Sequence, residues 1–294
     1  MYPAPFAYHA PRSVDQALAL LQRLPEAKIL AGGQSLIPLM NLGLARPPAL
    51  VDVNGLPGLD AVTAEDGHLR LGALVRHHVL ETSPVIQQYC PLLAEAAALI
   101  GNVRVRHRGT LGGSLAHADP AAELPLVATA LGATLEVRRA DGVREVAADS
   151  FFRGYLVTAL EPGELVTGVR VPAFGRGTGY GLAELVRRAG DFAIVAACAV
   201  LEIEGTGRCR RVSLALGGIG PQPLRARRVE ARLTNDVLTD RRIAEAADAV
   251  PDEVSPDSDI HASAAYRRAM ARVMAYRALV TAWTRATRQP GRSS

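Results

Sequence analysis

Two short segments carry the residues with the clearest chemical potential, because each places adjacent glycines among small or polar residues. They are residues 110–114, TLGGS, and residues 31–35, AGGQS. Adjacent glycines let backbone amides approach a ligand with no Cβ in the way, and successive amides in such a turn can bind an anion. Two phosphate-sized sites predict a diphosphate ligand such as a dinucleotide. Two unrelated loops would give the same pattern, since Gly-Gly is also an ordinary loop sequence.

The surrounding sequence predicts the elements that hold these segments. Residues 28–31 predict a short apolar strand, and residues 35–42 predict a helix whose amino end points at the first Gly-Gly turn. A helix amino terminus carries partial positive charge and free amides, which suits a phosphate. The second Gly-Gly turn is predicted to lie in a loop over residues 102–119, which leads into a helix over residues 121–131.

Four stretches of the chain resemble one known family. They are AGGQSLIPLMNLGLARPPALVDV from residue 31, RHRGTLGGSLAHADPAAELP from residue 106, GELVTGVRVP from residue 163 and RRAGDFAIVAACAVLE from residue 187. They resemble the FAD-binding medium subunit of molybdenum hydroxylases, of the carbon monoxide dehydrogenase and xanthine dehydrogenase flavoprotein type. The resemblance extends over nearly the whole chain. It implies an α+β protein: a PCMH-type, vanillyl-alcohol-oxidase-like FAD-binding fold of two α/β subdomains, followed by a C-terminal domain of β-sheet plus helices.

By this resemblance, the two glycine-rich segments hold the FAD pyrophosphate, Glu123 contacts the ribose or adenine portion, and Leu165 lies beside the flavin ring. Leu165 also fits a core strand residue, and both roles are compatible. Ser114 stands where the family often has Asn, which keeps a hydrogen-bonding group but shortens its reach. The implied cofactor-binding residues are Ala31, Gly32, Gly33, Gln34, Ser35, Leu36, Ile100, Gly101, Thr110, Leu111, Gly112, Gly113, Ser114, Glu123 and Leu165.

Arg188 and Asp191 match a family motif near the flavin but are left outside this site. An ordinary ion pair at a strand start would give the same pattern.

The composition limits the chemistry that the chain performs by itself. Its three cysteines, Cys90, Cys198 and Cys209, form no C-x-x-C pair and are too few for a cluster held by four cysteines. Cys90 and Cys198 lie in apolar stretches and are expected to fill the core. The chain has no H-E-x-x-H, G-x-S-x-G or Walker lysine motif, so nothing supports a hydrolase or a nucleoside triphosphatase. We therefore expect no catalytic side chain and no metal ligand.

The bulk properties also limit the partners. The net charge is +4, but the arginines are scattered and aromatic residues make up only 4%, which argues against a nucleic-acid surface. No apolar run approaches the ~20 residues of a membrane helix. The amino terminus, MYPAPFAYHAPRS, lacks the basic start and apolar core of a secretory signal, so a cytoplasmic protein is expected.

Periodicity and turn residues divide the chain into three parts. Residues 1–54 predict a parallel β-α-β-α-β unit, with strands at 6–8, 28–31 and 49–53 and a first helix opened by a capping box at Ser13 and Gln16. Residues 55–174 predict a second FAD-binding subdomain of α+β type. Residues 179–288 predict a C-terminal α+β domain, after a glycine-rich linker at 175–179. The tail from Gln289 is expected to be loose.

Within the second part, the pattern predicts hairpins around residues 65–67 and 141–142, helices at 76–82 and 91–100, and a strand at 164–171. His77 and His78 diverge by about 100° on a helix and are expected to be solvated rather than to share a metal. Asp119 is expected to cap the helix opened by Pro120. The third part predicts strands at 180–186, 193–204 and 211–217 and helices at about 240–249 and 263–286.

The resemblance implies an oxidoreductase subunit that transfers electrons. A large molybdopterin subunit would oxidise the substrate, a small [2Fe–2S] subunit would pass electrons to the FAD, and the flavin would reduce an external acceptor, in a dimer of heterotrimers. The basic stretch with Arg104, Arg106 and Arg108 either meets an acidic partner surface or is simply solvated. Two alternatives stay open: a self-contained reductase of the UDP-sugar enolpyruvyl reductase type, and a flavin-free scaffold subunit.

Overall fold

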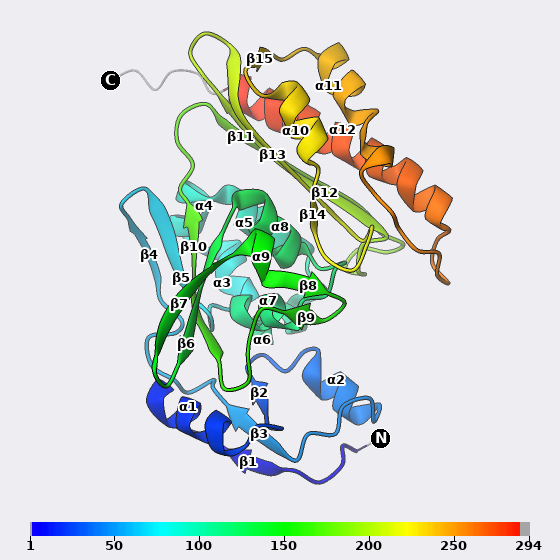
Figure 1. Ribbon diagram of the computed structural model, residues 1–294. Helices are drawn as coiled ribbons and strands as arrows, with labels where there is room; N and C mark the ends of the chain where they lie inside the picture. The colour runs from blue at the N-terminus through cyan, green and yellow to red at the C-terminus, as the bar shows by residue number, and fades with distance from the viewer. Residues whose placement is uncertain (1, 289–294) are drawn as a thin grey trace.

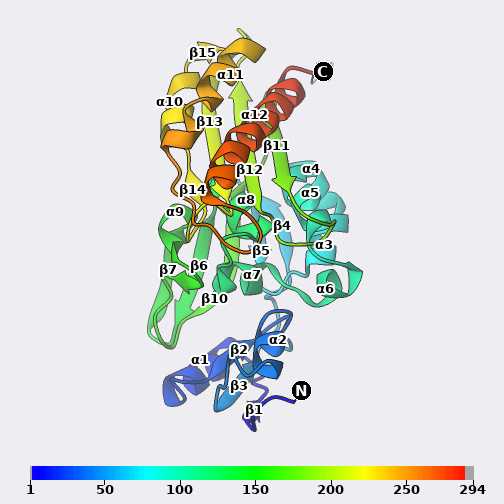
Figure 2. The ribbon, with the colours of Figure 1, turned by 90° about the vertical axis from the view of Figure 1, so that its right-hand side faces the viewer.

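Three main sheets follow one another along the length of the molecule, and each is built from one part of the chain (Figure 1). The computed structural model describes residues 2–288. The expectation for the tail from Gln289 lies outside the described residues. The first part of the chain lies at one end of the molecule, the last part at the other, and the helices of the middle part face both (Figures 1 and 2).

The first part is the predicted parallel unit. Its elements are β1 (Ala7–His9), α1 (Val14–Arg23), β2 (Lys28–Leu30), α2 (Leu36–Asn41) and β3 (Ala49–Asp52), and the parallel strands lie in the order β1-β3-β2. The capping residues open α1 as expected. The Ser13 Oγ accepts from the Gln16 amide at 3.2 Å, and the Gln16 side chain accepts from the Arg12 amide at 2.9 Å. The apolar face of α1, with Ala17, Leu18 and Leu21, is buried.

The middle part contains a five-stranded antiparallel sheet in the order β4-β5-β10-β6-β7. Its strands are β4 (Val62–Glu65), β5 (His68–Gly72), β6 (Thr134–Arg139), β7 (Gly142–Ala147) and β10 (Leu165–Pro172). Side chains alternate across this sheet: Leu69 and Leu71 are buried toward the helices, whereas Arg70 between them is exposed. The pairing of β4 with β5 and of β6 with β7 confirms both predicted hairpins, and β10 confirms the strand predicted at 164–171.

Helices cover the buried face of the middle sheet. They are α3 (His77–Thr82), α4 (Pro84–Tyr89), α5 (Pro91–Leu99), α6 (Val103–Arg108), α7 (Leu111–His117), α8 (Glu123–Leu131) and α9 (Ala148–Phe151), the last leading into a short hairpin of β8 (Phe152–Gly154) and β9 (Val157–Thr158). The predicted loop over residues 102–119 is wrong, because it contains α6 and α7. Each begins at a side-chain cap: Asn102 accepts from the Arg104 and Val105 amides, and Thr110 accepts from the Gly113 amide.

The last part packs one long helix on a second antiparallel sheet. The strands are β11 (Thr178–Leu185), β12 (Val195–Ile203), β13 (Arg208–Gly217), β14 (Leu224–Arg225) and β15 (Asp236–Val237), and the helices are α10 (Arg227–Leu233), α11 (Asp240–Ala247), a 3-10 turn (Val250–Asp252) and α12 (Ala264–Arg288). The glycine-rich stretch 175–179 is not wholly a linker, because Thr178 and Gly179 already belong to β11. The other face of this sheet contacts α8 of the middle part.

The three cysteines lie in the core. Cys90, Cys198 and Cys209 are all buried and unpaired, which confirms the expectation for the first two. Among residues 2–288, no helix combines the length and the apolar character that a membrane span requires. The same part of the chain contains no group of three or more His, Cys, Asp or Glu side chains that could hold a metal ion.

Candidate functional site

The first glycine-rich segment forms an open row of backbone donors between β2 and α2. Within the described residues, the amide N–H groups of residues 32–36 donate to no acceptor of the chain. Gly33 has a φ of +71°, a left-handed conformation that glycine adopts without strain. Ser35 precedes α2 and makes no capping hydrogen bond with its side chain. Five successive free amides and one hydroxyl are the donor set that a phosphate group needs.

The second glycine-rich segment is the first turn of a helix rather than an open Gly-Gly turn. Its amides are already used: Leu111 donates to the Val75 carbonyl at 2.9 Å, Gly112 to the Ala73 carbonyl at 2.8 Å, and Gly113 to the Thr110 hydroxyl at 3.2 Å. The interpretation of residues 110–114 as a turn with free amides is therefore wrong. The glycines allow close packing instead, because a Cβ on Gly112 would lie 2.6 Å from the Ala73 Cβ.

The tertiary structure brings the two segments into contact. A Cβ on Gly32 would lie 2.5 Å from the Arg108 carbonyl oxygen and 2.8 Å from the Gly109 Cα, so only glycine fits there without movement. A Cβ on Gly113 would lie 3.7 Å from the Ala31 Cβ. Two segments almost eighty residues apart thus line one surface, which is where a single diphosphate would have to meet both.

His77 is a structural residue of this site that the sequence analysis missed. It is buried rather than solvated: its amide donates to the Gly109 carbonyl at 3.0 Å, and its Nε2 donates to the Thr110 carbonyl at 3.0 Å. Burial lowers the pKa of His77 to about 4, so the ring is neutral at pH 7. The buried Leu80 lies three residues further along α3, on the same face. That spacing is the signal that separates His77 from the more exposed His78.

The other predicted residues lie on separate elements. Ile100 packs against the main core, and Gly101 has a φ of +45°. A Cβ on Gly190 would lie 2.5 Å from the Gly101 carbonyl oxygen, so the loop that carries Arg188 and Asp191 touches Gly101. Leu165 is buried in the cluster against which Ala31 packs, which confirms its core role and places it beside the first segment.

Glu123 is a buried carboxyl at the start of α8. Burial, with smaller contributions from the nearby Glu184 and Asp119 carboxylates, raises the pKa of Glu123 to about 7. A protonated Glu123 would donate a hydrogen bond, whereas an ionised one would only accept. The sequence predicted that Asp119 caps the helix opened by Pro120, but Asp119 does not cap α8. It accepts from the Ala121 amide at 2.9 Å, and Ala122 is the residue that precedes the helix.

Arg106 is already engaged within the chain. Its Nε donates to the Glu81 carboxylate at 2.8 Å, and its Nη1 donates to the Ile100 carbonyl at 3.1 Å. Arg104 and Arg108 are exposed at the same end of the molecule's middle part. Only these two of the three arginines are therefore available to a partner surface.

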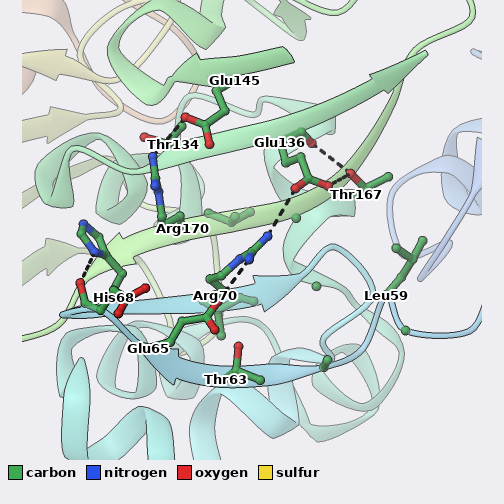
Figure 3. Close-up of a pocket in the computed structure, with 17 residues that line it drawn as sticks. Leu59, Thr63, Glu65, His68, Arg70, Thr134, Glu136, Glu145, Thr167 and Arg170 are labelled. Atoms are coloured by element: carbon green, nitrogen blue, oxygen red, sulfur yellow. Dashed lines mark hydrogen bonds and ion pairs between the residues drawn. The ribbon is translucent and has the colours of Figure 1, made fainter. Parts of the chain in front are cut away.

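A polar cavity of about 430 Å³ lies on the open face of the middle sheet (Figure 3). Arg70 contacts Glu65 at 3.1 Å and Glu136 at 3.6 Å, and Arg170 contacts Glu145 at 3.0 Å. None of the predicted cofactor residues lines this cavity. Its lining carries four carboxylates against two arginines, which does not suit a phosphate, so the cavity is not a part of the candidate site.

The chain is similar to known proteins over nearly all of its length. The model of the FAD binding domain in molybdopterin dehydrogenase matches residues 4–174, and that of the CO dehydrogenase flavoprotein C-terminal domain matches residues 181–282. The carbon monoxide dehydrogenase medium chain of Hydrogenophaga pseudoflava is 41% identical over 97% of this chain and 99% of its own length. A 6-hydroxypseudooxynicotine dehydrogenase complex subunit alpha of Paenarthrobacter nicotinovorans is also 41% identical, over 97% of each chain.

The solved structures give the same relationship. A chain of carbon monoxide dehydrogenase from Hydrogenophaga pseudoflava superimposes with a TM-score of 0.94, covering 97% of this chain and 99% of that one. These relatives are medium chains or subunits of larger complexes, so partner subunits are implied. Neither the self-contained reductase nor the flavin-free scaffold finds support among them. The chain belongs to the family of FAD-binding medium subunits of molybdopterin dehydrogenases, flavoprotein components of multi-subunit oxidoreductases of the carbon monoxide dehydrogenase type.

Proposed function

We propose that residues 31–36 and 110–114 together hold the pyrophosphate of one non-covalently bound FAD. The row of free amides at residues 32–36 is the observation that carries this proposal, because five successive donors without an acceptor in the described chain can bind a phosphate. The contact between Gly32 and Arg108–Gly109 supports it, since the second segment then lies against the first. Here the second segment supplies shape, because its amides are already used within the chain, and the first segment supplies the free amide donors.

The remaining predicted residues are assigned to the rest of the cofactor. Glu123 is proposed to contact the ribose or adenine portion, and Leu165, Ile100 and Gly101 to border the flavin ring. When bound, FAD supplies a ring that exchanges electrons singly or in pairs, and the protein supplies binding, orientation and electrostatics. The buried Leu165 would keep water from its side of the ring, and Glu123, with a pKa of about 7, is only partly ionised near neutral pH.

The electron donor and acceptor lie outside this chain. We infer a small [2Fe–2S] subunit as the donor to the flavin, a large molybdopterin subunit as the site of substrate oxidation, and an external acceptor for the flavin's electrons. A dimer of heterotrimers in the cytoplasm is the assembly that this division of labour implies. We also propose domain limits of 1–54, 55–174 and 179–288, since the sheets change at those points.

Release of the cofactor tests the core of this proposal. Denaturing the purified chain should set free one yellow molecule with the mass of FAD per chain. Flavin that stays attached to the denatured chain would show covalent attachment, and FMN in place of FAD would remove the need for a pyrophosphate site. A purified complex that contains this chain without any flavin would contradict the proposal as a whole.

A further inference from the structure

We propose that Arg76 and Asn54 form a clamp that sets the spacing between the two glycine-rich segments, and that both act as positioning residues for the cofactor. Neither residue belongs to either segment. The proposal rests on the function proposed above, since the clamp has a role only if both segments hold one ligand.

Asn54 holds the first segment from the end of β3. Its Nδ2 donates to the Ala31 carbonyl at 2.8 Å and to the Asp52 carboxylate at 2.7 Å. Asp52 is itself held by the Tyr8 hydroxyl, at 2.5 Å. The Asn54 amide is thus fixed from the side of the first sheet, and the Ala31 carbonyl is tied down directly before the row of free amides.

Arg76 joins this amide to the second segment. Its Nη2 donates to the Asn54 Oδ1 at 2.7 Å, and its Nη1 donates to the Arg108 carbonyl oxygen. Guanidinium groups only donate and carbonyl oxygens only accept, so the pattern assigns the Asn54 amide unambiguously: oxygen toward Arg76 and nitrogen toward Ala31. One continuous path of hydrogen bonds therefore runs from the Ala31 carbonyl to the Arg108 carbonyl.

The Arg76–Asn54 hydrogen bond of the clamp is a part-buried contact between the first part of the chain and the middle part. The second segment is bound to its own sheet through the Ala73 and Val75 carbonyls and through His77. Beyond the turn that links them, residues 2–54 and the middle part share one other hydrogen bond among the described residues, the exposed pair of Arg138 and Asp15. Without the clamp, packing and the exposed Arg138–Asp15 pair would be left to hold the free amides of the first segment at a set distance from α7.

A double-mutant cycle on the full chain tests the clamp. The variants are Arg76→Gln, Asn54→Ala, the double variant and Arg76→Lys. Arg70→Gln is the matched control, because Arg70 makes its ion pairs on the open face of the middle sheet, away from the clamp. The measurement is the Kd of the apoprotein for FAD, followed by quenching of flavin fluorescence. Each single clamp variant should raise the Kd by on the order of tenfold, since each removes a hydrogen bond to a charged group. Arg70→Gln should leave it unchanged.

Two outcomes separate positioning from simple charge. The double variant should bind no more weakly than the weaker single variant, because both changes cut the same path. Arg76→Lys keeps the charge but loses the two-pronged donor, so it should not restore binding. Full binding by Arg76→Lys, or losses that add in the double variant, would overturn the clamp.

The melting temperature of each apoprotein checks the fold, and Arg76→Lys carries the test if Arg76→Gln does not fold. A wild-type chain that binds no FAD would contradict the proposed function. A wild-type chain that binds FAD alongside clamp variants that bind it equally well would contradict only the clamp.

Discussion

Gly33 and Gly112 both have to be glycine, but for different physical reasons. Gly33 has a positive φ and lies in the row of free amides. Gly112 has helical backbone geometry, and its amide already donates to the Ala73 carbonyl. A side chain at Gly33 would disturb the donors of the first segment, whereas a side chain at Gly112 would separate α7 from the end of β5. The same Gly-Gly pattern thus has two structural causes.

Substitution of Gly33 should therefore affect cofactor binding more than stability. Gly33→Ala forces a left-handed conformation on alanine, which costs about 1–2 kcal/mol, and moves the amides from their positions. The FAD content of the purified protein should fall sharply while circular dichroism stays near wild type. Gly55→Ala is the control, because Gly55 has open space around its Cα and no positive φ. Full FAD occupancy in Gly33→Ala would show that the first segment does not hold the phosphates.

Gly112→Ala should show the opposite balance. Its Cβ would lie 2.9 Å from the Ala73 carbonyl oxygen as well as 2.6 Å from the Ala73 Cβ, and such overpacking costs about 1–3 kcal/mol. The melting temperature of the apoprotein should drop, and any loss of FAD should follow the loss of folded protein. An unchanged melting temperature with loss of FAD would mean that Gly112 contacts the cofactor directly.

Glu123 should make the stability of the apoprotein depend on pH. Its pKa is about 7 in the folded chain against an ordinary 4.5, so the folded state binds the proton more tightly than the unfolded state. The contribution is fully present below about pH 4.5 and is lost as pH rises through about 7, with an upper limit of about 3 kcal/mol. Denaturant unfolding of Glu123→Gln should lack this loss.

His77 changes in the opposite direction over nearly the same range. Its folded pKa of about 4 lies below its ordinary 6.5, so its contribution is present above about pH 6.5 and is lost as pH falls through about 4. The two effects partly cancel in the wild-type chain. The quantity to compare is therefore the difference between wild type and Glu123→Gln from pH 5 to 8. A difference that does not change with pH would contradict the raised pKa of Glu123.

At the scale of elements, short helices and close packing build the site. α6 and α7 have six and seven residues, too short to be stable alone, and each begins at a capping side chain. α7 is held just beyond the end of β5 by the Ala73 and Val75 carbonyls. The site therefore depends on the middle sheet, because the sheet supplies the acceptors that fix the helix.

The packing of α12 on β11 gives a prediction at this scale. A Cβ on Gly181 would lie 2.1 Å from the Ala278 carbonyl oxygen, so Gly181→Ala must push the helix away from the strand. The free energy of unfolding should fall by about 1–3 kcal/mol or more. Gly205→Ala, in the turn between β12 and β13, is the control, because nothing lies within 4 Å of its added Cβ. Equal stabilities of the two variants would contradict the close approach of α12 and β11.

At the scale of the whole molecule, the relatives of the chain are subunits of larger complexes, so we expect a bound flavin to receive its electrons from partner subunits. The chain's three cysteines are buried and separate, and the described residues contain no metal-binding group. The isolated chain with FAD should therefore be reduced by dithionite but not by the substrate of its complex. Adding the partner subunits should restore bleaching of the flavin by substrate, and omitting each in turn should abolish it. Turnover by this chain alone, with NADPH and a nucleotide sugar, would instead reveal a self-contained reductase.

The sequence by itself determined the local elements and the family. Alternation and turn residues located both hairpins of the middle sheet, and the capping pair at Ser13 and Gln16 located the start of α1, because these patterns depend on residues only a few positions apart. The motifs around residues 31 and 110 were sufficient to indicate the FAD-binding subunits of molybdenum hydroxylases. Long motifs in a fixed order are rarely shared by chance.

Only the tertiary structure decided how the two glycine-rich segments differ. The Ala73 and Val75 carbonyls take the amides of residues 111 and 112, and these acceptors come from a strand end that is remote in the sequence. His77 is buried because its ring lies against the Thr110 carbonyl. Asn54 contacts Arg76 because the end of β3 lies next to the start of α3. No local pattern encodes such contacts, because their free energy arises only once distant parts of the chain are packed together.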